Sequence, residues 1–326
     1  MALFDLPLEE LERYAPALRR PDDFEAFWSK TVTEASGHEL DVRMNPVDHG
    51  LELIESWDVG FAGFGGHPIR AWLHLPATKA RDEPLPAVVQ YQGYGGGRGL
   101  AHESVLWVTA GYAHLVVDTR GQGSAWSTGD TADPVGSTPA QPGFMTRGIL
   151  DPHDYYYRRV YIDAVRAVEV VRGDQRIDGE RVVVAGASQG GGIALGVSAL
   201  VPDLVAVMVD VPFLCDFPRA IEITDRDPYA EITRYLKAHR DQREQVLRTL
   251  SYFDGVLHAS AGGAPALFSV ALMDETCPPS TVYAAYNAYG GSKELVVYPY
   301  NDHEGGGAWQ QARQIDWLRC QLEQGR

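Results

Sequence analysis

The segment Gly186-Ala187-Ser188-Gln189-Gly190 places a serine between two glycines, in a pattern suited to acyl transfer. The apolar run at 181–185 before it predicts a buried strand, and the small residues that follow it predict a helix. Strand, Gly-x-Ser-x-Gly and helix together form the nucleophile elbow, a tight turn that lifts the serine hydroxyl above the sheet edge. We expect Gly186 and Gly190 to be needed for close backbone approach and for positive φ. The pattern predicts Ser188 as the nucleophile.

A serine hydroxyl needs a base to take its proton, and the base needs an acid to hold its tautomer. Around this type of elbow the chain order is serine, acid, histidine. Asp274 follows a predicted strand at 266–271, and His303 follows the last predicted strand at 293–298. The spacing therefore predicts Ser188, Asp274 and His303 as nucleophile, acid and base.

Other titratable residues remain as alternatives. Asp210 also ends a predicted strand and could serve as the acid, while Glu275 and Asp302 adjoin the favoured acid and base. His258 is the nearest rival base, although it lies in a predicted helix or its cap.

Acyl transfer also needs hydrogen-bond donors for the developing oxyanion. The backbone N–H of Gln189, next to the nucleophile, is one expected donor. The glycine-rich loop at 92–97 follows a predicted strand, and we expect Tyr94 in that loop to supply the second donor. The sequence has no His-Glu-x-x-His, no phosphate-binding Gly-x-x-x-x-Gly-Lys-Ser/Thr and no Rossmann spacing, so we expect no metal and no cofactor.

The elements that must position these residues alternate between buried strands and helices. The predicted strands lie at 87–91, 113–118, 181–185, 205–209, 266–271 and 293–298. This alternation indicates an α/β fold with a mostly parallel sheet and helices on both faces. Residues 52–59 and 69–75 alternate in hydrophobicity and predict an antiparallel pair.

The rest of the chain adds to this sheet without the length or core of a second domain. Residues 1–50 predict an N-terminal helical extension, with helical spacing over 8–18 and a second helix starting at 21–24. Two segments are inserted, a long loop at 124–154 and a helical stretch at 215–260, which could cap the site or decorate the surface. We expect one domain over 1–326.

Composition excludes several classes of protein. The chain has 326 residues with a formal charge of −16, which argues against binding nucleic acid or an anionic membrane. No apolar run approaches the roughly 18 residues of a membrane helix, and the N-terminus lacks the pattern of a signal peptide. Cys215, Cys277 and Cys320 have no pairing or zinc-binding spacing, so we expect reduced thiols in a cytoplasmic protein.

Four motifs in this order resemble the acetyl xylan esterase/cephalosporin C deacetylase family of carbohydrate esterases. They are Tyr91-Gln92-Gly93-Tyr94, Asp118-Thr119-Arg120-Gly121-Gln122-Gly123, Gly186-Ala187-Ser188-Gln189-Gly190-Gly191-Gly192 and His303-Glu304. Segments 148–151 and 155–158 also look like the long loop of that family. Each short motif is weak alone, but the ordered set is specific, and the resemblance runs from the N-terminal helices to the last helix.

The resemblance implies an α/β-hydrolase that removes acetyl groups from small esters, including acetylated xylo-oligosaccharides and cephalosporin C. It assigns the same nucleophile, acid, base and oxyanion donors as the residue patterns do. It implies that Arg120 and Gln122 order the loops around the pocket. The alternatives are another acyl hydrolase on this scaffold, peptidase-like or a broad carboxylesterase, and a catalytically silent scaffold.

The loop at 124–154 also bears on assembly. Its apolar residues are Trp126, Pro134, Pro139, Pro142, Phe144, Met145 and Ile149. A solvated linker seldom carries so many apolar groups, so we expect a homo-oligomer. The resemblance implies a hexamer built from dimers, with active sites that face an inner space and admit only small substrates.

Overall fold

The computed structural model describes residues 3–77, 83–136 and 138–324. Within them a nine-stranded sheet has the order β1-β2-β3-β5-β4-β6-β7-β8-β9. The strands are β1 (Arg43–Val47), β2 (Ile54–Ala62), β3 (Pro68–Pro76), β4 (Leu85–Tyr91), β5 (Ala113–Val117), β6 (Ile177–Ala187), β7 (Ala206–Asp210), β8 (Ala266–Ala271) and β9 (Lys293–Tyr298). β1, β2, β3 and β5 pair antiparallel, and the strands from β5 through β4 to β9 pair parallel. The predicted mostly parallel sheet is confirmed.

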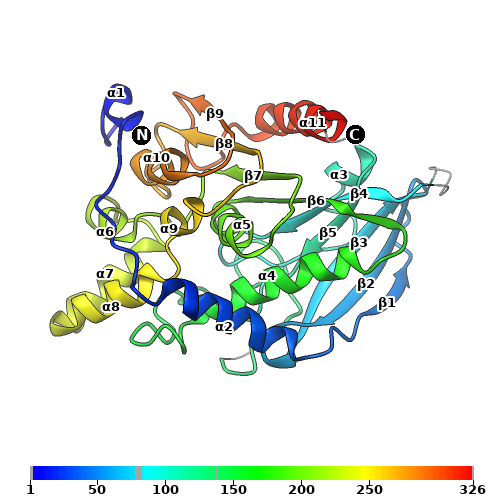
Figure 1. Ribbon diagram of the computed structural model, residues 1–326, viewed down its shortest axis with the longest axis horizontal. Helices are drawn as coiled ribbons and strands as arrows, with labels where there is room; N and C mark the ends of the chain where they lie inside the picture. Colours follow the sequence, from blue (N-terminus) through cyan, green and yellow to red (C-terminus); the bar gives the residue numbers. More distant parts are fainter. Residues whose placement is uncertain (1–2, 78–82, 137, 325–326) are drawn as a thin grey trace.

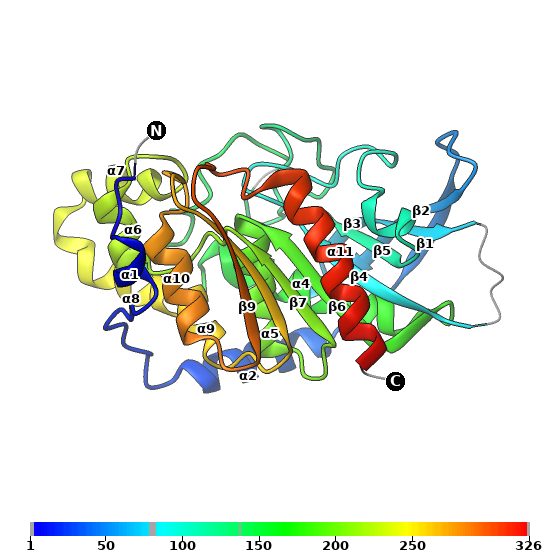
Figure 2. The ribbon, with the colours of Figure 1, turned by 90° about the horizontal axis from the view of Figure 1, so that it is seen from above.

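Helices cover both faces of the sheet (Figures 1 and 2). One face carries α2 (Phe24–Ser36), α4 (Tyr156–Arg172), α5 (Gln189–Leu200), α9 (Gly255–Ala259) and α10 (Pro279–Ala288); the other carries α3 (Leu106–Thr109) and α11 (Gly307–Gln324). In β6, Val182 and Val184 pack toward α4 and α5, while Val183 packs with Trp107 of α3 and Trp317 of α11. Burial on both faces explains why this strand is apolar without alternation.

The N-terminal extension differs from the prediction over 8–18. Its first helix, α1 (Leu8–Leu11), stops after four residues, although helical spacing continues beyond it. Pro16 has no N–H to continue a helix. The carbonyl groups of Leu11 and Tyr14 instead accept hydrogen bonds from Asn287 Nδ2, at 3.1 and 2.9 Å. β1 was not predicted, because most of its side chains are exposed and show no alternating pattern.

The inserted segment at 215–260 forms α6 (Phe217–Ile223), α7 (Tyr229–Ala238), α8 (Arg243–Ser251) and α9. The described residues of the other inserted segment, 124–136 and 138–154, form no helix and no strand of the sheet. In the described part of the chain, no helix combines the length and apolar character needed to cross a bilayer.

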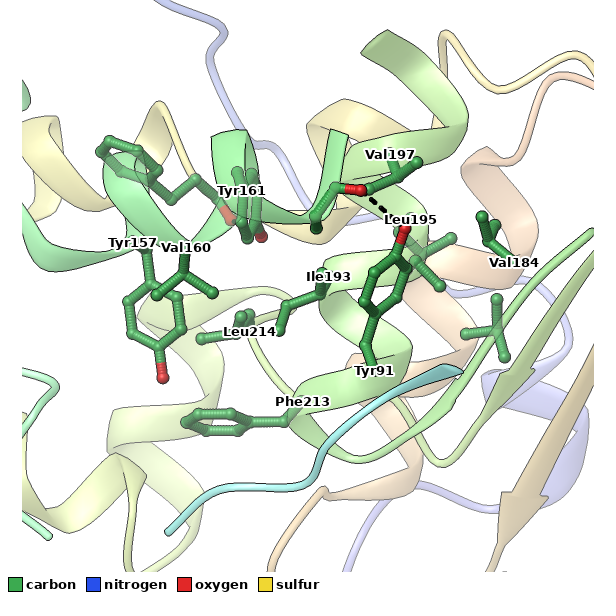
Figure 3. Close-up of a cluster of buried hydrophobic side chains, with 14 of the residues drawn as sticks. Tyr91, Tyr157, Val160, Tyr161, Val184, Ile193, Leu195, Val197, Phe213 and Leu214 are labelled. Atoms are coloured by element: carbon green, nitrogen blue, oxygen red, sulfur yellow. Dashed lines mark hydrogen bonds between the residues drawn. The ribbon is translucent and has the colours of Figure 1, made fainter. Parts of the chain in front are cut away.

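The helix that follows Ser188 is buried from Gln189 to Ser198. Figure 3 shows Ile193 of this helix in a cluster with Tyr157 and Tyr161 of α4 and Tyr91 of β4. The hydroxyl of Tyr91 donates to the carbonyl of Ala164 at 3.0 Å, which ties β4 to α4. Dense packing of this kind resists displacement. The start of α5 is therefore a rigid support for the serine before it.

Candidate active site

Ser188 lies at the junction of β6 and α5 with φ 55° and ψ −120°. Its N–H donates to the carbonyl of Asp210 at 2.9 Å, and its own carbonyl accepts from the N–H groups of Gly192 (3.1 Å) and Phe213 (2.9 Å). Positive φ is uncommon for a residue with a side chain and persists where surrounding bonds over-determine it. Three backbone bonds do so here, and the turn has the geometry of a nucleophile elbow.

The two glycines of the elbow are required by close backbone approach. A Cβ on Gly186 would lie 2.2 Å from the carbonyl carbon of Gly190, and a Cβ on Gly190 would lie 2.3 Å from the carbonyl oxygen of Tyr91. Neither glycine has positive φ, so that part of the expectation was wrong. The strained conformation belongs to Ser188 itself.

The structure brings Asp274 and His303 together at the carboxyl ends of β8 and β9. Asp274 is fully buried, and its Oδ1 accepts from the N–H groups of Thr276 and Cys277, both at 2.8 Å. Its Oδ2 lies 2.8 Å from Nδ1 of His303, whose side chain is 31% exposed. Because a carboxylate only accepts hydrogen bonds, Nδ1 carries the proton and Nε2 is free to accept one.

The alternative acids have other partners. The carboxylate of Asp210 accepts from Gln310 (2.8 Å) and Gln314 (2.7 Å) of α11, and burial raises its pKa to about 6. Glu275 accepts from Nε of Arg226 at 3.0 Å. Among the described residues, Asp274 supplies the one carboxylate within hydrogen-bond distance of His303, so Asp302 is also set aside.

The rival base, His258, is fully buried in α9. Its Nε2 lies 3.1 Å from the carbonyl of Tyr252, and burial lowers its pKa to about 4. This histidine is a structural side chain in the core beside α2.

Cys277, predicted from the sequence only as a reduced thiol, is a neighbour of the site. Ligand atoms of Asp274, Cys277 and His303 lie within 4.8 Å of one another, the one potential metal-binding group in the described chain. Burial and then Asp274 raise the pKa of the Cys277 thiol well above its usual range, and contact with the Ser188 hydroxyl acts in the opposite direction. Metals bind the thiolate form of cysteine, which a raised pKa disfavours. Both Asp274 oxygens already accept hydrogen bonds. The cluster therefore fits a neutral thiol that lines the site better than it fits a metal site.

The glycine-rich loop at 92–97 faces the start of α5. In the part of the chain that the structure describes, the backbone N–H groups of Tyr94 and Gln189 donate to no protein acceptor. Gln122 is fully buried and joins the two segments, since its Oε1 accepts from the N–H of Gly95 (2.7 Å) and its Nε2 donates to Oε1 of Gln189 (2.8 Å). This side chain therefore bonds to the residue after Tyr94 and to the side chain of Gln189, next to both expected oxyanion donors.

Arg120 lies further from the site, in a buried ion-pair network. Its guanidinium makes two bonds to Asp163, at 2.5 and 2.6 Å, and lies 3.5 Å from Asp133. Asp133 also accepts from Arg159 at 2.8 Å. The network fixes the segment that leads to Gln122, because the carbonyl of Arg120 accepts from the hydroxyl of Tyr156 at 2.5 Å and Tyr156 also contacts Gln122.

Sequence reasoning missed the anchor of the Tyr94 side chain. Its hydroxyl donates to Glu231 of α7 at 2.7 Å and accepts from the N–H groups of Gly143 (3.2 Å) and Phe144 (2.8 Å). The other oxygen of Glu231 accepts from the N–H of Met145 at 3.0 Å, and burial raises the pKa of this carboxyl. Both inserted segments therefore contact the candidate oxyanion loop. The helix α7 supplies one of these contacts and does not merely lie on the surface.

Glu231→Gln should lower kcat for acetate esters about 10-fold, with KM little changed. Glutamine has one acceptor oxygen where the carboxylate has two, so it cannot accept from both the Tyr94 hydroxyl and the Met145 N–H. Its amide N–H must face one of these two groups in a poor contact, and the loop must shift. Removing an oxyanion donor outright costs roughly 10²–10³ in kcat, and a displaced donor should cost less. Glu244→Gln, an exposed glutamate in α8 of the same insertion, is the matched control and should behave as the parent protein. Equal kcat in the two variants would show that Tyr94 needs no such anchor.

The sheet, the elbow after β6 and the chain order Ser188, Asp274, His303 define an α/β-hydrolase. Residues 1–321 match the model of the acetyl xylan esterase (AXE1) family. The chain belongs to this family and is a carboxylic ester hydrolase.

Individual relatives agree with this assignment. The chain is 38% identical to the solved acetyl xylan esterase from Paenibacillus sp. R4, with a TM-score of 0.90 over 97% of this chain and 99% of that one. It is 31% identical to acetyl xylan esterase 1 from Thermoanaerobacterium sp. JW/SL YS485, with a TM-score of 0.87 over 97% and 99% of the chains. The acetyl esterase Axe7A of Xylanibacter ruminicola is 24% identical over 319 residues, which are 96% of this chain and 70% of that protein.

Proposed function

We propose that this protein is a serine esterase that removes acetyl groups from small esters such as acetylated xylo-oligosaccharides and cephalosporin C. One observation carries the proposal. The Asp274 carboxylate holds Nδ1 of His303 at 2.8 Å, and the Cys277 thiol, which lies within 4.8 Å of both side chains, also contacts the Ser188 hydroxyl. Acetyl xylan esterases with the same fold over nearly the whole chain support the acetyl ester as substrate.

In the first half of the reaction, Nε2 of His303 takes the proton of the Ser188 hydroxyl, and Oγ attacks the acetyl carbonyl carbon. The carbonyl oxygen becomes an oxyanion that accepts hydrogen bonds from the backbone N–H groups of Tyr94 and Gln189. When the tetrahedral intermediate collapses, the ester C–O bond breaks and the alcohol leaves with the proton from His303. The serine is then acetylated.

In the second half, His303 takes a proton from water, and the hydroxide attacks the acetyl group on Ser188. Acetic acid leaves as the proton returns to the serine oxygen, and the acid then gives its proton to water. Asp274 remains a carboxylate throughout and stabilises the imidazolium that forms in each half. Two backbone N–H groups donate to its Oδ1 and hold the carboxylate in place.

Acyl preference tests the proposed substrate. With p-nitrophenyl esters, acetate should give the highest kcat/KM, and each added methylene should lower it about 10-fold or more in a fitted pocket. The buried Cys277 thiol lies within 4.8 Å of the ligand atoms of Asp274 and His303 and so takes up space beside the proposed acyl site. An aminoacyl p-nitroanilide should be turned over far more slowly than the acetate ester. Faster hydrolysis of butyrate or octanoate than of acetate, or of the anilide, would reject an acetyl esterase.

We further propose a cytoplasmic homo-oligomer, a hexamer by family resemblance. Free thiols at Cys215, Cys277 and Cys320 fit a reducing compartment. The apolar argument for assembly is weaker than the sequence suggested, because Phe144, Met145 and Ile149 are buried within their own subunit.

Light scattering at micromolar concentration should report a mass several times that of one 35.8 kDa chain. Val135, in the long loop, is 65% exposed and is an apolar side chain that a second copy could cover. A mass equal to one chain would reject the oligomer and, with it, size exclusion by an inner space.

A further inference from the structure

Trp126 is a large aromatic side chain that is 62% exposed and yet fixed in position. Its indole Nε1 donates to the backbone carbonyl of Tyr94 at 2.8 Å. Tyr94 is the residue whose N–H is the proposed oxyanion donor. The ring is therefore attached to the loop that would hold the reacting ester.

Glycines make room for the ring on this loop. A Cβ on Gly96 would lie 2.2 Å from Cζ2 of the indole, and a Cβ on Gly93 would lie 3.3 Å from the same atom. The same Cβ on Gly93 would lie 4.0 Å from the carbonyl oxygen of Ala187, the residue before Ser188. The indole thus packs against the backbone of Gly93 and Gly96, and Gly93 in turn lies close to the residue before the nucleophile.

The turn that carries Trp126 is bonded to the oxyanion loop on both sides. The N–H of Ala125 donates to the carbonyl of Gly95 at 3.1 Å. On the far side, the N–H groups of Gly97 and Gly99 donate to the carbonyls of Ser127 (3.3 Å) and Thr128 (2.9 Å). These bonds leave the turn little freedom to let its ring move away.

A fixed but exposed indole has lost conformational freedom without removing its outer surface from water. A ligand that covers this surface gains burial and incurs no further ordering of the side chain. The face of an aromatic ring carries negative charge density. It therefore suits the weakly positive C–H groups on the apolar face of a pyranose ring.

We propose that Trp126 is a stacking platform for a sugar ring of the acetylated carbohydrate, while the acetyl group occupies the site at Ser188. This inference rests on the proposed function and concerns the sugar part of the substrate, which takes no part in bond making or breaking. The platform would select carbohydrate esters over equally reactive acetates without a ring, through KM more than through kcat.

Trp126→Phe and Trp126→Leu form a matched pair, because both lose the N–H bond to Tyr94 but only the leucine variant loses the aromatic face. Each is assayed with ethyl acetate, which has no ring, and with acetylated xylobiose. The ratio of KM for the sugar ester to KM for ethyl acetate should rise about 2- to 12-fold in Trp126→Leu. In Trp126→Phe the ratio should stay near that of the parent protein.

The outcomes separate this inference from the proposed function. No turnover of either ester by the parent protein would reject the esterase. Normal turnover with an unchanged KM ratio in Trp126→Leu would overturn the platform alone. An unchanged ratio together with a lower oligomeric mass of Trp126→Leu would assign the ring to contact with a second copy and would equally overturn the platform.

Discussion

Ser188→Ala should reduce the turnover of p-nitrophenyl acetate to near background, a loss of about 10⁴-fold or more. The acetyl group would have no oxygen to bond to, and the remaining N–H donors and histidine could act only on bound water. Alanine should leave the fold intact, because the bonds that fix the elbow are made by backbone atoms. Residual activity measured at high enzyme concentration checks the prediction.

Ser198→Ala is the matched control for this variant. Ser198 is also buried in α5, and its hydroxyl donates to the carbonyl of Leu195 one turn earlier, at 2.7 Å, and contacts the Tyr289 side chain. It should retain the parent kcat. A Ser188→Ala protein with more than about a hundredth of the parent rate would mean that another group attacks the ester.

Asp274→Asn should lower kcat about 10³- to 10⁴-fold. The asparagine oxygen can keep the N–H groups of Thr276 and Cys277, which leaves the amide nitrogen facing His303. That nitrogen donates to Nδ1, so the imidazole proton moves to Nε2 and the base can no longer accept the serine proton. The imidazolium also loses its opposite charge.

Asp210→Asn is the matched control for Asp274→Asn. It tests whether activity needs the Asp274 carboxylate in particular or any buried carboxylate at the end of a strand. The Asp210 side chain meets the amides of Gln310 and Gln314 and makes no bond to His303, so kcat should stay within a few-fold of the parent value. Should Asp210→Asn show the large loss and Asp274→Asn the small one, the acid has been misassigned.

Much of the sheet could be predicted because its signals are local. The strands expected at 266–271 and 293–298 have those bounds in the structure. Pro265 precedes the first strand, and Ser292 and Pro299 flank the second. The first helix was overpredicted because its spacing is helical, whereas its carbonyls bond to Asn287 far along the chain. A hydrogen-bond partner so distant in the sequence cannot be predicted from the local spacing of apolar residues.

The candidate site divides in the same way. The elbow at Ser188 is a local motif, and chain order was enough to select Asp274 and His303. Glu231 contacts Tyr94 across 137 positions, and its acidic side chain resembles that of any solvated helix. Similarly, Trp126 could be predicted only as one apolar residue among many, because its bond to the oxyanion loop depends on how two loops fold together.

Identification of the residue that reacts covalently tests the central claim most directly. A fluorophosphonate should lose fluoride to an activated serine, and peptide mass spectrometry should place one adduct on Ser188 in the parent protein and none in Ser188→Ala. Labelling should parallel loss of acetate-ester turnover and should be slow in Asp274→Asn. An adduct on another residue, or equal labelling of Ser188→Ala, would contradict the assignment of Ser188 as the nucleophile of this esterase.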